Sequence, residues 1–317
     1  MTKLLCVSDL HDVEKKHVQM VEYAKGCDAL ITCGDDFDRE DANHEYEANS
    51  VIGALLKKHQ EQSKISPETS GEFQDLLRRI DGVPEDKQES ELQAFSQRHP
   101  GFEEKVKRIS EGIKTDFLAY FTKRANAING WYAKAGIPVF GTPGNHDPLP
   151  ALRELKAVKY LAGTTANLGN LTFAGLPATG EWVPGPMKFC PEFYQHLMNY
   201  SAVKDENESG EISGLAKKLI EHQGSIDVFV THKAYKIDLQ KWDKHYAQDD
   251  QFGVDAGALA VAKKHKPKLN VFGHYHMEKP KVAFRDGTFH LYVGPNAAVK
   301  VTLEGNKPVD FESVYYT

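Results

Sequence analysis

Short apolar runs alternate with a more polar segment in the first 40 residues of the chain. Lys3–Ser8 and Ala29–Cys33 are short and mainly apolar, which is typical of buried strands, and Glu14–Ala24 between them has the pattern of a helix. The sequence therefore predicts a strand, a helix and a second, parallel strand. In open α/β sheets, ligand sites lie at the carboxyl ends of such strands.

The pattern becomes helical between residues 40 and 135. Ser66-Pro67 resembles an N-cap followed by proline at the first helical position. Apolar residues then follow three- and four-residue spacing, at Phe102, Val106, Ile109, Ile113, Phe117, Phe121 and Ile128. We expect one long amphipathic helix that ends near Gly136. The segment has 14 basic and 17 acidic residues, a net charge of 14 − 17 = −3, so we expect a cap or an oligomer surface rather than a nucleic-acid-binding arm.

The second half of the chain is rich in predicted strands. A hairpin is expected over residues 164–176, with its turn at Gly169-Asn170, and short helices at residues 149–158 and 256–264. Further strands are predicted at Ile137–Phe140, Ile226–Val230, Leu269–Phe272, Lys281–Phe284, Phe289–Val293 and Ala298–Leu303. The long loops at 179–189 and 234–253 carry Trp182, Trp242, Tyr235 and Tyr246. We expect them to line a binding site.

The composition is that of a water-soluble protein, with 40% hydrophobic and 26% charged residues in 317. Its apolar runs are much shorter than the roughly 18 residues that span a bilayer, and its first residues lack a secretory pattern, so we expect a cytoplasmic protein without membrane contact. The four cysteines, Cys6, Cys27, Cys33 and Cys190, have no C-x-x-C spacing and are expected to be free, buried thiols. The net charge of −6 gives no general attraction to nucleic acid.

Polar residues suited to metal binding follow five of the predicted strands. They are Asp9-Leu10-His11, Gly34-Asp35, Gly144-Asn145-His146-Asp147, His232 and Gly273-His274-Tyr275-His276. Carboxylate and amide oxygens mixed with imidazole nitrogens suit divalent first-row metals such as Mn, Fe, Zn, Co or Ni. Residues two apart on an extended segment point the same way, so Asp9 and His11 are expected to lie on one side of the chain, and so are His274 and His276. A set this large can hold two ions, and a carboxylate such as Asp35 can bind both.

Each motif is weak when taken singly. Asp-x-His and a lone histidine are common in turns and on surfaces, and Gly-Asn-His-Asp can form an ordinary Asx turn. Their order and their places after strands favour a metal centre. The glycines of these motifs, Gly34, Gly144 and Gly273, are expected to permit sharp turns where the chain leaves each strand.

These five motifs resemble those of the calcineurin-like metallophosphoesterase family: D-x-H, G-D-x-x-D-R, G-N-H-[DE], H and G-H-x-H. The resemblance implies one domain over residues 1–317, a four-layer α-β-β-α sandwich of two mixed sheets, with residues 40–135 as a helical insertion. It implies that Asp9, His11, Asp35 and His276 bind one divalent ion, with Mn, Fe or Zn the expected metals. The second ion would be bound by Asp35, Asn145, His232 and His274.

The resemblance also implies hydrolysis of a phosphate ester by in-line attack of a metal-activated hydroxide. His146 would protonate the leaving oxygen, and Asp147 would orient His146 and help to keep it protonated. Arg39 is a candidate contact for the substrate phosphate, although an exposed ion pair with a nearby glutamate explains it equally well.

Two departures from the family pattern affect the choice of substrate. Asp38-Arg39-Glu40 replaces the Asp-Arg-Gly of protein serine/threonine phosphatases, and Lys233-Ala234-Tyr235 replaces the two prolines common after the fourth-motif histidine. We expect a small phosphodiester or phosphomonoester as substrate. A nuclease, which would need a basic track, and a protein phosphatase are the alternatives within the family. A non-catalytic scaffold that binds a partner through residues 40–135 is less consistent with intact ligand motifs.

Overall fold

The computed structural model describes residues 1–11, 13–36, 58, 61–62, 65–80, 85–144, 147, 152, 154–177, 214–234 and 256–317. The chain divides into two compact units. The first contains residues 1–39, 121–182 and 197–317, and the second contains residues 40–120 and 183–196. Within the described part, no helix has the length and hydropathy needed to cross a membrane.

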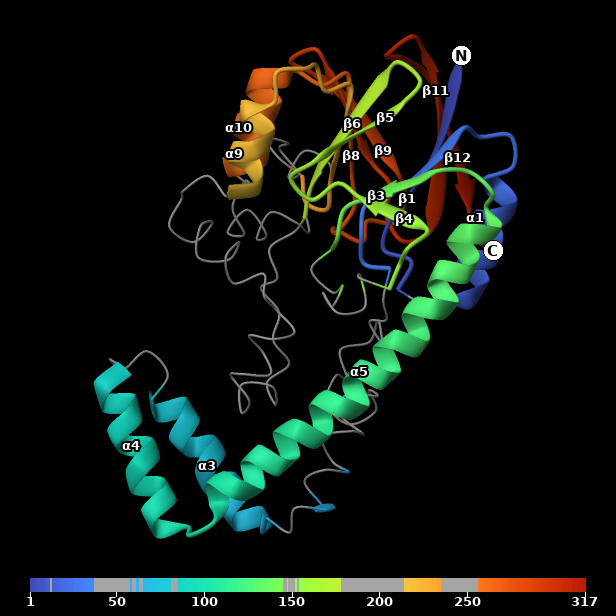
Figure 1. Ribbon diagram of the computed structural model, residues 1–317. Helices are drawn as coiled ribbons and strands as arrows, with labels where there is room; N and C mark the ends of the chain where they lie inside the picture. Colours follow the sequence, from blue (N-terminus) through green and yellow to red (C-terminus); the bar gives the residue numbers. More distant parts are fainter. Residues whose placement is uncertain are drawn as a thin grey trace. The chain divides into compact units, whose positions relative to one another are not determined.

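The first unit contains two mixed six-stranded sheets (Figure 1). The first sheet has the order β12 (Lys307–Tyr315), β11 (Ala297–Glu304), β1 (Thr2–Val7), β2 (Ala29–Thr32), β3 (Val139–Gly141) and β4 (Val158–Tyr160). Strands β1 to β4 run parallel, while β11 is antiparallel to both β1 and β12. The parallel part brings the carboxyl ends of β1, β2 and β3 to one edge.

The second sheet has the order β5 (Thr165–Leu168), β6 (Leu171–Leu176), β7 (Val228–Thr231), β8 (Leu269–Phe272), β10 (Thr288–Tyr292) and β9 (Lys281–Arg285). Here β6, β7, β8 and β10 are parallel, and the two edge strands are antiparallel to their neighbours. The β5–β6 hairpin confirms the turn predicted at Gly169-Asn170. The carboxyl ends of β7 and β8 again lie side by side.

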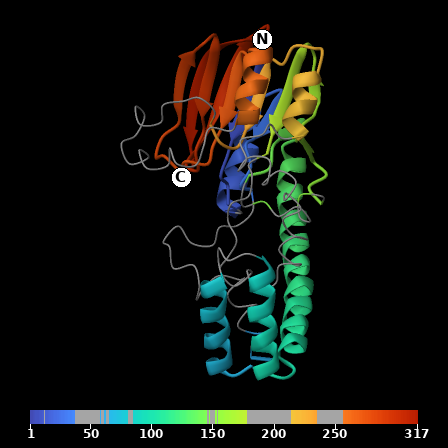
Figure 2. The same ribbon diagram turned by 90° about the vertical axis from the view of Figure 1, so that its left-hand side faces the viewer.

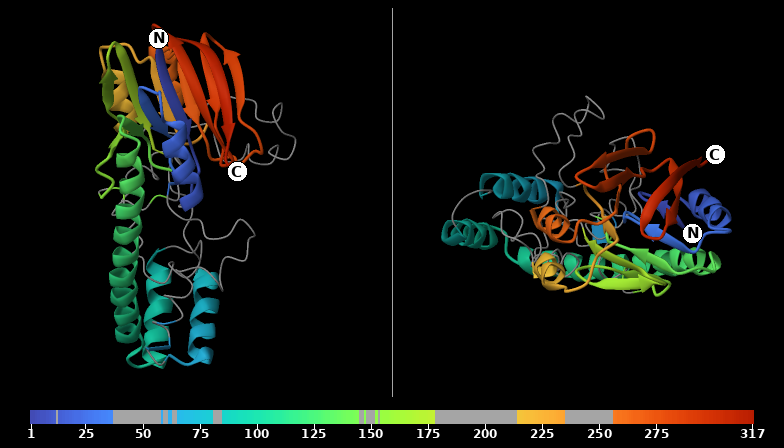
Figure 3. Two further views of the ribbon diagram at one scale, coloured as in Figure 1. Left: turned by 90° about the vertical axis from the view of Figure 1, so that its right-hand side faces the viewer. Right: turned by 90° about the horizontal axis from the view of Figure 1, so that it is seen from above.

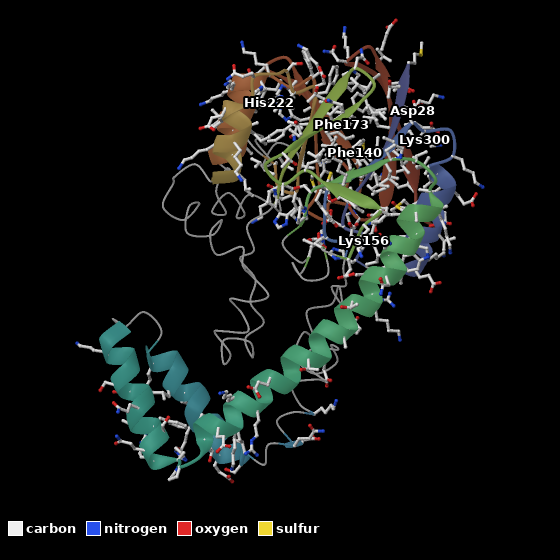
Figure 4. The ribbon with its side chains drawn as sticks, in the orientation of Figure 1. Asp28, Phe140, Lys156, Phe173, His222 and Lys300 are labelled. Atoms are coloured by element: carbon white, nitrogen blue, oxygen red, sulfur yellow. The ribbon has the colours of Figure 1, made fainter. Side chains whose placement is uncertain are left out.

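The main core lies between the two sheets. Alternate residues of the parallel strands, such as Cys6, Ile31 and Val230, are fully buried there, as the side-chain alternation of strands requires. Phe140 of β3 stacks on Phe173 of β6 with ring centroids 4.9 Å apart, and both rings are labelled in Figure 4. This apolar contact joins one sheet to the other. The buried thiols Cys6, Cys27 and Cys33 are free, as predicted, while Cys190 lies outside the described residues.

Helices cover the outer faces of both sheets, giving the predicted four-layer α/β sandwich. Helices α9 (Gly214–Glu221) and α10 (Ala256–His265) lie side by side (Figure 2) and bury Leu219 and Val261 against the second sheet. On the first sheet, α1 (Glu14–Tyr23) lies beside the C-terminal end of α5 (Phe102–Lys134) (Figure 3). His17 of α1 stacks on Trp131 of α5, with ring centroids 4.5 Å apart.

The second unit contains helices α3 (Pro67–Ile80) and α4 (Glu85–Arg98) and the N-terminal part of α5. Ser66 caps α3 as predicted, because its hydroxyl accepts a hydrogen bond from the N–H of Thr69 at 3.2 Å. The long helix predicted to end near Gly136 is α5. Its Phe102 and Ile128 are buried, whereas the side chains of Val106, Ile109, Ile113, Phe117 and Phe121 lie outside the described ones.

Several predicted elements differ from the structure. Residues 154–157 form turns and coil, and residues 158–160 form strand β4, so the end of the helix predicted at 149–158 was wrong. Strand β12 was not predicted, because most of its side chains are exposed and its apolar residues are interrupted by charged ones. The short helix α9 was also missed. The loop residues expected to line a site, Trp182, Trp242, Tyr235 and Tyr246, lie outside the part of the chain that the structure describes.

Candidate metal centre

The structure gathers six of the seven predicted metal ligands at the carboxyl ends of the central strands. Two groups of side chains each place their ligand atoms within 4.8 Å of one another. The first group is Asp9, His11, Asp35 and His276, and the second is Asp35, His232 and His274. Asp35 belongs to both. The seventh predicted ligand, Asn145, lies outside the described residues, as do His146 and Arg39.

Both sheets contribute ligands. Asp9 and Asp35 follow β1 and β2 of the first sheet, while His232 and His274 follow β7 and β8 of the second. Backbone hydrogen bonds tie neighbouring strand ends together: the N–H of Asp9 donates to the carbonyl of Gly34 at 3.0 Å, and the N–H of Gly273 donates to that of His232 at 3.0 Å. The site therefore lies where the parallel strands of the two sheets end.

The local backbone of these ligands is not the extended one that the sequence predicted. Asp9, His11, Asp35, His274 and His276 all have positive φ angles, between 46° and 72°. Each lies in the left-handed region, which is uncommon for residues other than glycine and strained unless the surroundings hold it. Asp9 and His11 do belong to one ligand group, but strand alternation, the reason given for expecting this, was wrong. The strands end before the ligands begin.

Three side chains of the first group converge closely. The Nε2 atoms of His11 and His276 are 3.2 Å apart, and Nε2 of His276 is 3.3 Å from Oδ1 of Asp9. The backbone N–H of His274 donates to Oδ2 of Asp9 at 3.0 Å and orients that carboxylate. Two imidazole nitrogens and a carboxylate oxygen aimed at one point are a donor set that suits a first-row divalent cation.

The second group is built around His232. Its Nδ1–H donates to the carbonyl of Cys33 at 2.7 Å, which leaves Nε2 directed at Oδ2 of Asp35, 3.3 Å away. Nδ1 of His274 lies 3.2 Å from the same Nε2. A histidine that donates its other ring N–H to a carbonyl has a fixed tautomer and orientation, which is the usual arrangement of a metal ligand.

The buried acids and histidines of the site shift one another's pKa values. Burial opposes ionisation of Asp9, yet the hydrogen bond from His276 and the charge of His232 outweigh it and hold its pKa well below the usual range. Burial also disfavours the imidazolium of His232, but the Asp35 carboxylate outweighs burial and raises the pKa of His232 to about 9. Burial and the charge of His232 place the pKa of His274 well below its usual value. Buried carboxylates compensated in this way have the charge that a cation site requires.

Asp147 holds the backbone around the shared ligand. Its Oδ2 accepts hydrogen bonds from the N–H of Asp35 at 2.9 Å and of Gly144 at 2.7 Å, and its Oδ1 accepts one from the N–H of Asp36 at 2.9 Å. The carboxylate is buried. This positioning of two loops was not predicted from the sequence. The predicted role of Asp147 in orienting His146 stays a prediction, because His146 lies outside the described residues.

The motif glycines are needed mainly where loops approach closely. A Cβ atom on Gly273 would overlap the Ser8 hydroxyl and the Asp9 carboxylate, and one on Gly144 would overlap Asp35. Gly34 has a φ angle of 90°, so it alone of the three supports the predicted reason, a turn that side chains rarely allow. Gly144 and Gly273 instead let one ligand loop pack against another.

A second buried acid lies next to the shared ligand and was missed by the sequence analysis. Asp36 Oδ1 accepts hydrogen bonds from the Tyr132 hydroxyl at 2.5 Å and from the Thr32 hydroxyl at 3.1 Å. Burial, and next the charge of Asp147, raise the pKa of Asp36 to about 8. One signal in the sequence pointed to Asp36, its position beside Asp35. Nothing in the helical pattern of α5 singles out Tyr132.

Solved structures and a family model show similarity to this chain, whereas the curated proteins do not. No curated protein matches the chain. One solved crystal structure is 12% identical, with a TM-score of 0.50 and 99% of each chain covered, which shows a shared fold.

Two named structures have lower TM-scores. A Staphylococcus aureus protein described as a 5'-nucleotidase is 14% identical with a TM-score of 0.45, covering 98% of this chain and 53% of its own, so this chain spans about half its length. The phosphopantetheinyl hydrolase of Mycobacterium tuberculosis is 12% identical with a TM-score of 0.38, covering 93% of this chain and 90% of its own.

The family model described as calcineurin-like phosphoesterase matches residues 107–278, more than half of the chain. The match includes the last three of the five motifs, while those around Asp9 and Asp35 precede it. Both groups of ligands combine residues from the matched region with these two earlier motifs. The chain belongs to the calcineurin-like phosphoesterase family.

Proposed function

We propose that this protein is a dinuclear metal-dependent phosphoesterase that hydrolyses a small phosphodiester or phosphomonoester. The observation that carries the proposal is the sharing of Asp35 by two groups of potential ligands. A carboxylate common to both groups is the simplest way to keep two cations about 3.5 to 4 Å apart. Mn, Fe and Zn fit the mixture of nitrogen and oxygen donors, and Asn145 is proposed as a further ligand of the second ion.

The proposed mechanism assigns a task to each set of residues. When bound, two divalent ions lower the pKa of a water molecule and neutralise charge on the phosphoryl oxygens. Asp9, Asp35 and the four histidines would hold the two ions. His146 is proposed to donate a proton to the leaving oxygen, oriented by Asp147, and Arg39 to contact the phosphate. Asp147 also keeps the Asp35 backbone in place through its hydrogen bond.

The choice of a small substrate rests on charge and on sequence departures. Neither the net charge of −6 nor the segment 40–135 provides the basic track that a nuclease uses along its substrate. Glu40 replaces the glycine of the protein phosphatase signature. A nuclease and a protein phosphatase are therefore the alternatives to be tested, and a non-catalytic scaffold is disfavoured by the convergence of six ligand residues.

A panel of substrates tests this function. Full-length protein purified without chelator would be assayed with bis-p-nitrophenyl phosphate, p-nitrophenyl phosphate, cyclic nucleotides, single-stranded DNA and a phosphopeptide. We expect hydrolysis of the small esters that EDTA abolishes and Mn²⁺ restores. The His274→Ala variant should lose it, while His222→Ala, outside the site, should keep it. No hydrolysis of any ester by metal-loaded protein would contradict the proposal, and preferential cleavage of DNA would favour the nuclease.

The helical segment 40–135 is proposed as a cap over the site or as a surface for homo-oligomers. Helices α3 and α4 bury Leu76 and Phe95, so this part has a small apolar core of its own. Size-exclusion chromatography with light scattering on the full chain and on a variant lacking residues 40–100 would test the interface. An oligomer that persists in the deletion variant would exclude residues 40–100 as its contact.

A further inference from the structure

Tyr132 in α5 is hydrogen-bonded to Asp36, the residue after the shared ligand Asp35, and has no place in the proposed reaction. We propose that Tyr132 and Asp36 form a buried pair that positions the shared ligand Asp35 and thereby sets the affinity for both metal ions. The inference rests on the proposed dinuclear centre and adds a positioning residue to it. The Tyr132 hydroxyl donates to Asp36, so its effect on the ligands would pass through Asp36.

The pair is held by short contacts in a buried environment. The Tyr132 hydroxyl donates to Oδ1 of Asp36 at 2.5 Å, and the Thr32 hydroxyl donates to the same oxygen at 3.1 Å. Tyr132 is 1% exposed, and Asp36 and Thr32 are fully buried. Hydrogen bonds to an acid in such surroundings are stronger than in water, so they fix the direction of the Asp36 side chain.

The fixed side chain constrains the peptide next to it. The N–H groups of Asp35 and Asp36 donate to the two oxygens of Asp147, both at 2.9 Å. Asp35 itself has a φ of 55°, a left-handed conformation that costs of order 1–3 kcal/mol and persists only where neighbours enforce it. The Asp147 carboxylate on one side and the Tyr132–Asp36 contact on the other supply that enforcement.

The position of Tyr132 is itself rigid. The residue before it, Trp131, stacks on His17 of α1, and Asn129 accepts a hydrogen bond from the N–H of Ala157 at 2.7 Å. The last turns of α5 are thus attached to two other segments of the first unit. A hydroxyl held this firmly can orient Asp36, as ligand-supporting residues do in other metal sites.

The cost of the arrangement also needs an explanation. Asp36 adds a third buried carboxyl group beside Asp35 and Asp147, and buried acids that lie close together repel one another when ionised. Ionising an acid in this place therefore costs free energy. A positioning function explains why two hydroxyl donors surround this acid.

Metal titration of the full chain tests the inference. Apoprotein prepared with chelator would be titrated with Co²⁺, following the visible absorption of the bound metal. Tyr132→Phe removes only the hydroxyl, and we expect it to bind both ions about 10- to 100-fold more weakly. Thr32→Val removes the other donor and should act in the same direction. Tyr23→Phe, which removes a hydroxyl bonded to the Tyr315 carbonyl at 2.8 Å, should bind Co²⁺ like wild type.

A double-mutant cycle separates positioning from general damage. If Tyr132 acts through Asp36, adding Tyr132→Phe to Asp36→Ala should weaken Co²⁺ binding no further. The inference would be overturned by wild-type Co²⁺ affinity in Tyr132→Phe, by weaker binding of one ion only, or by additive effects in the cycle. If Asp36→Ala does not fold, the Co²⁺ affinities of Tyr132→Phe and Thr32→Val decide the matter. Wild-type protein that binds two ions but hydrolyses no ester would refute the proposed function alone, leaving the affinity result intact.

Discussion

Oδ2 of Asp35 lies 3.3 Å from Nε2 of His232, although Asp35 follows a strand of the first sheet and His232 a strand of the second. The contact joins the two sheets at the edge where their parallel strands end. It also makes Asp35 a member of both ligand groups. The proposed chemistry depends on this junction, so changes that move the strand ends should affect metal binding as well as stability.

His146 is proposed as the general acid, and its loss should depend on the leaving group. We expect His146→Ala to retain metal but to lose about 10²- to 10⁴-fold in kcat on alkyl phosphate esters, because a poor leaving group needs the proton. The loss on p-nitrophenyl esters should be smaller, since that group leaves without one. Steady-state kinetics on both esters measures the difference. Equal losses would argue against the acid role.

Gly273→Ala should disturb the metal centre directly. Its Cβ would overlap the Ser8 hydroxyl and the Asp9 carboxylate, so we expect a loss of about 1–3 kcal/mol in unfolding free energy and weaker metal binding. Gly130→Ala is the matched control, since its Cβ would meet open space on a helix. Urea unfolding and metal titration report both effects. The close-approach argument is refuted if the two alanine variants behave alike.

The fold should become less stable in mild acid because of His17. Burial, strengthened by the charges of Arg124 and Lys16, lowers the pKa of His17 from 6.5 to about 4, against the opposing hydrogen bond to Val13. Below pH 6.5 the unfolded chain therefore binds the proton first, and stability falls as the pH drops towards about 4. The linked loss is about 3 kcal/mol.

Urea unfolding between pH 4 and pH 7 measures this loss. His17→Gln lacks the titrating group, so its stability should decline less steeply with falling pH than that of wild type. His222→Gln, which changes a histidine outside this contact, should follow the wild-type curve. Parallel curves for wild type and His17→Gln would show that His17 is not the responsible group.

The stack of Phe140 on Phe173 should be a major source of stability. Phe173 is fully buried between the sheets, so we expect Phe173→Ala to cost about 3–5 kcal/mol of unfolding free energy. Phe284→Ala is the control, because that ring is 65% exposed and should cost less than about 1 kcal/mol. Calorimetry or urea unfolding compares them. Similar losses in both variants would contradict the description of the core.

The sequence predicted most of the strands, and it singled out the residues that the structure gathers into two potential ligand groups, because both have local signals. A buried strand needs an apolar run, as at Leu269–Phe272, and the polar residues after it stand out. Exposed β12 has no such run, which is why it was missed. The resemblance to a family supplied the two-sheet arrangement. Strand spacing alone does not determine which sheet β7 joins, because that depends on contacts distant in the sequence.

The local conformation and side-chain contacts of the site could not be predicted from the sequence. The left-handed conformation of Asp9 and His274 is imposed by neighbouring loops, and no residue in either motif predicts it. The same is true of Tyr132, whose spacing on α5 identifies a buried position without revealing that its hydroxyl reaches Asp36. Contacts between side chains on separate elements become visible only when the fold is known.

The most direct test of the central claim is the number of metal ions bound per chain, measured by elemental analysis of equilibrated protein. We expect two ions in wild type and about one in His11→Ala, which affects the first group alone. Asp35→Asn, which alters the residue common to both groups, should retain neither ion tightly. One ion in wild type, or one tightly held ion in Asp35→Asn, would contradict a centre built around a shared aspartate.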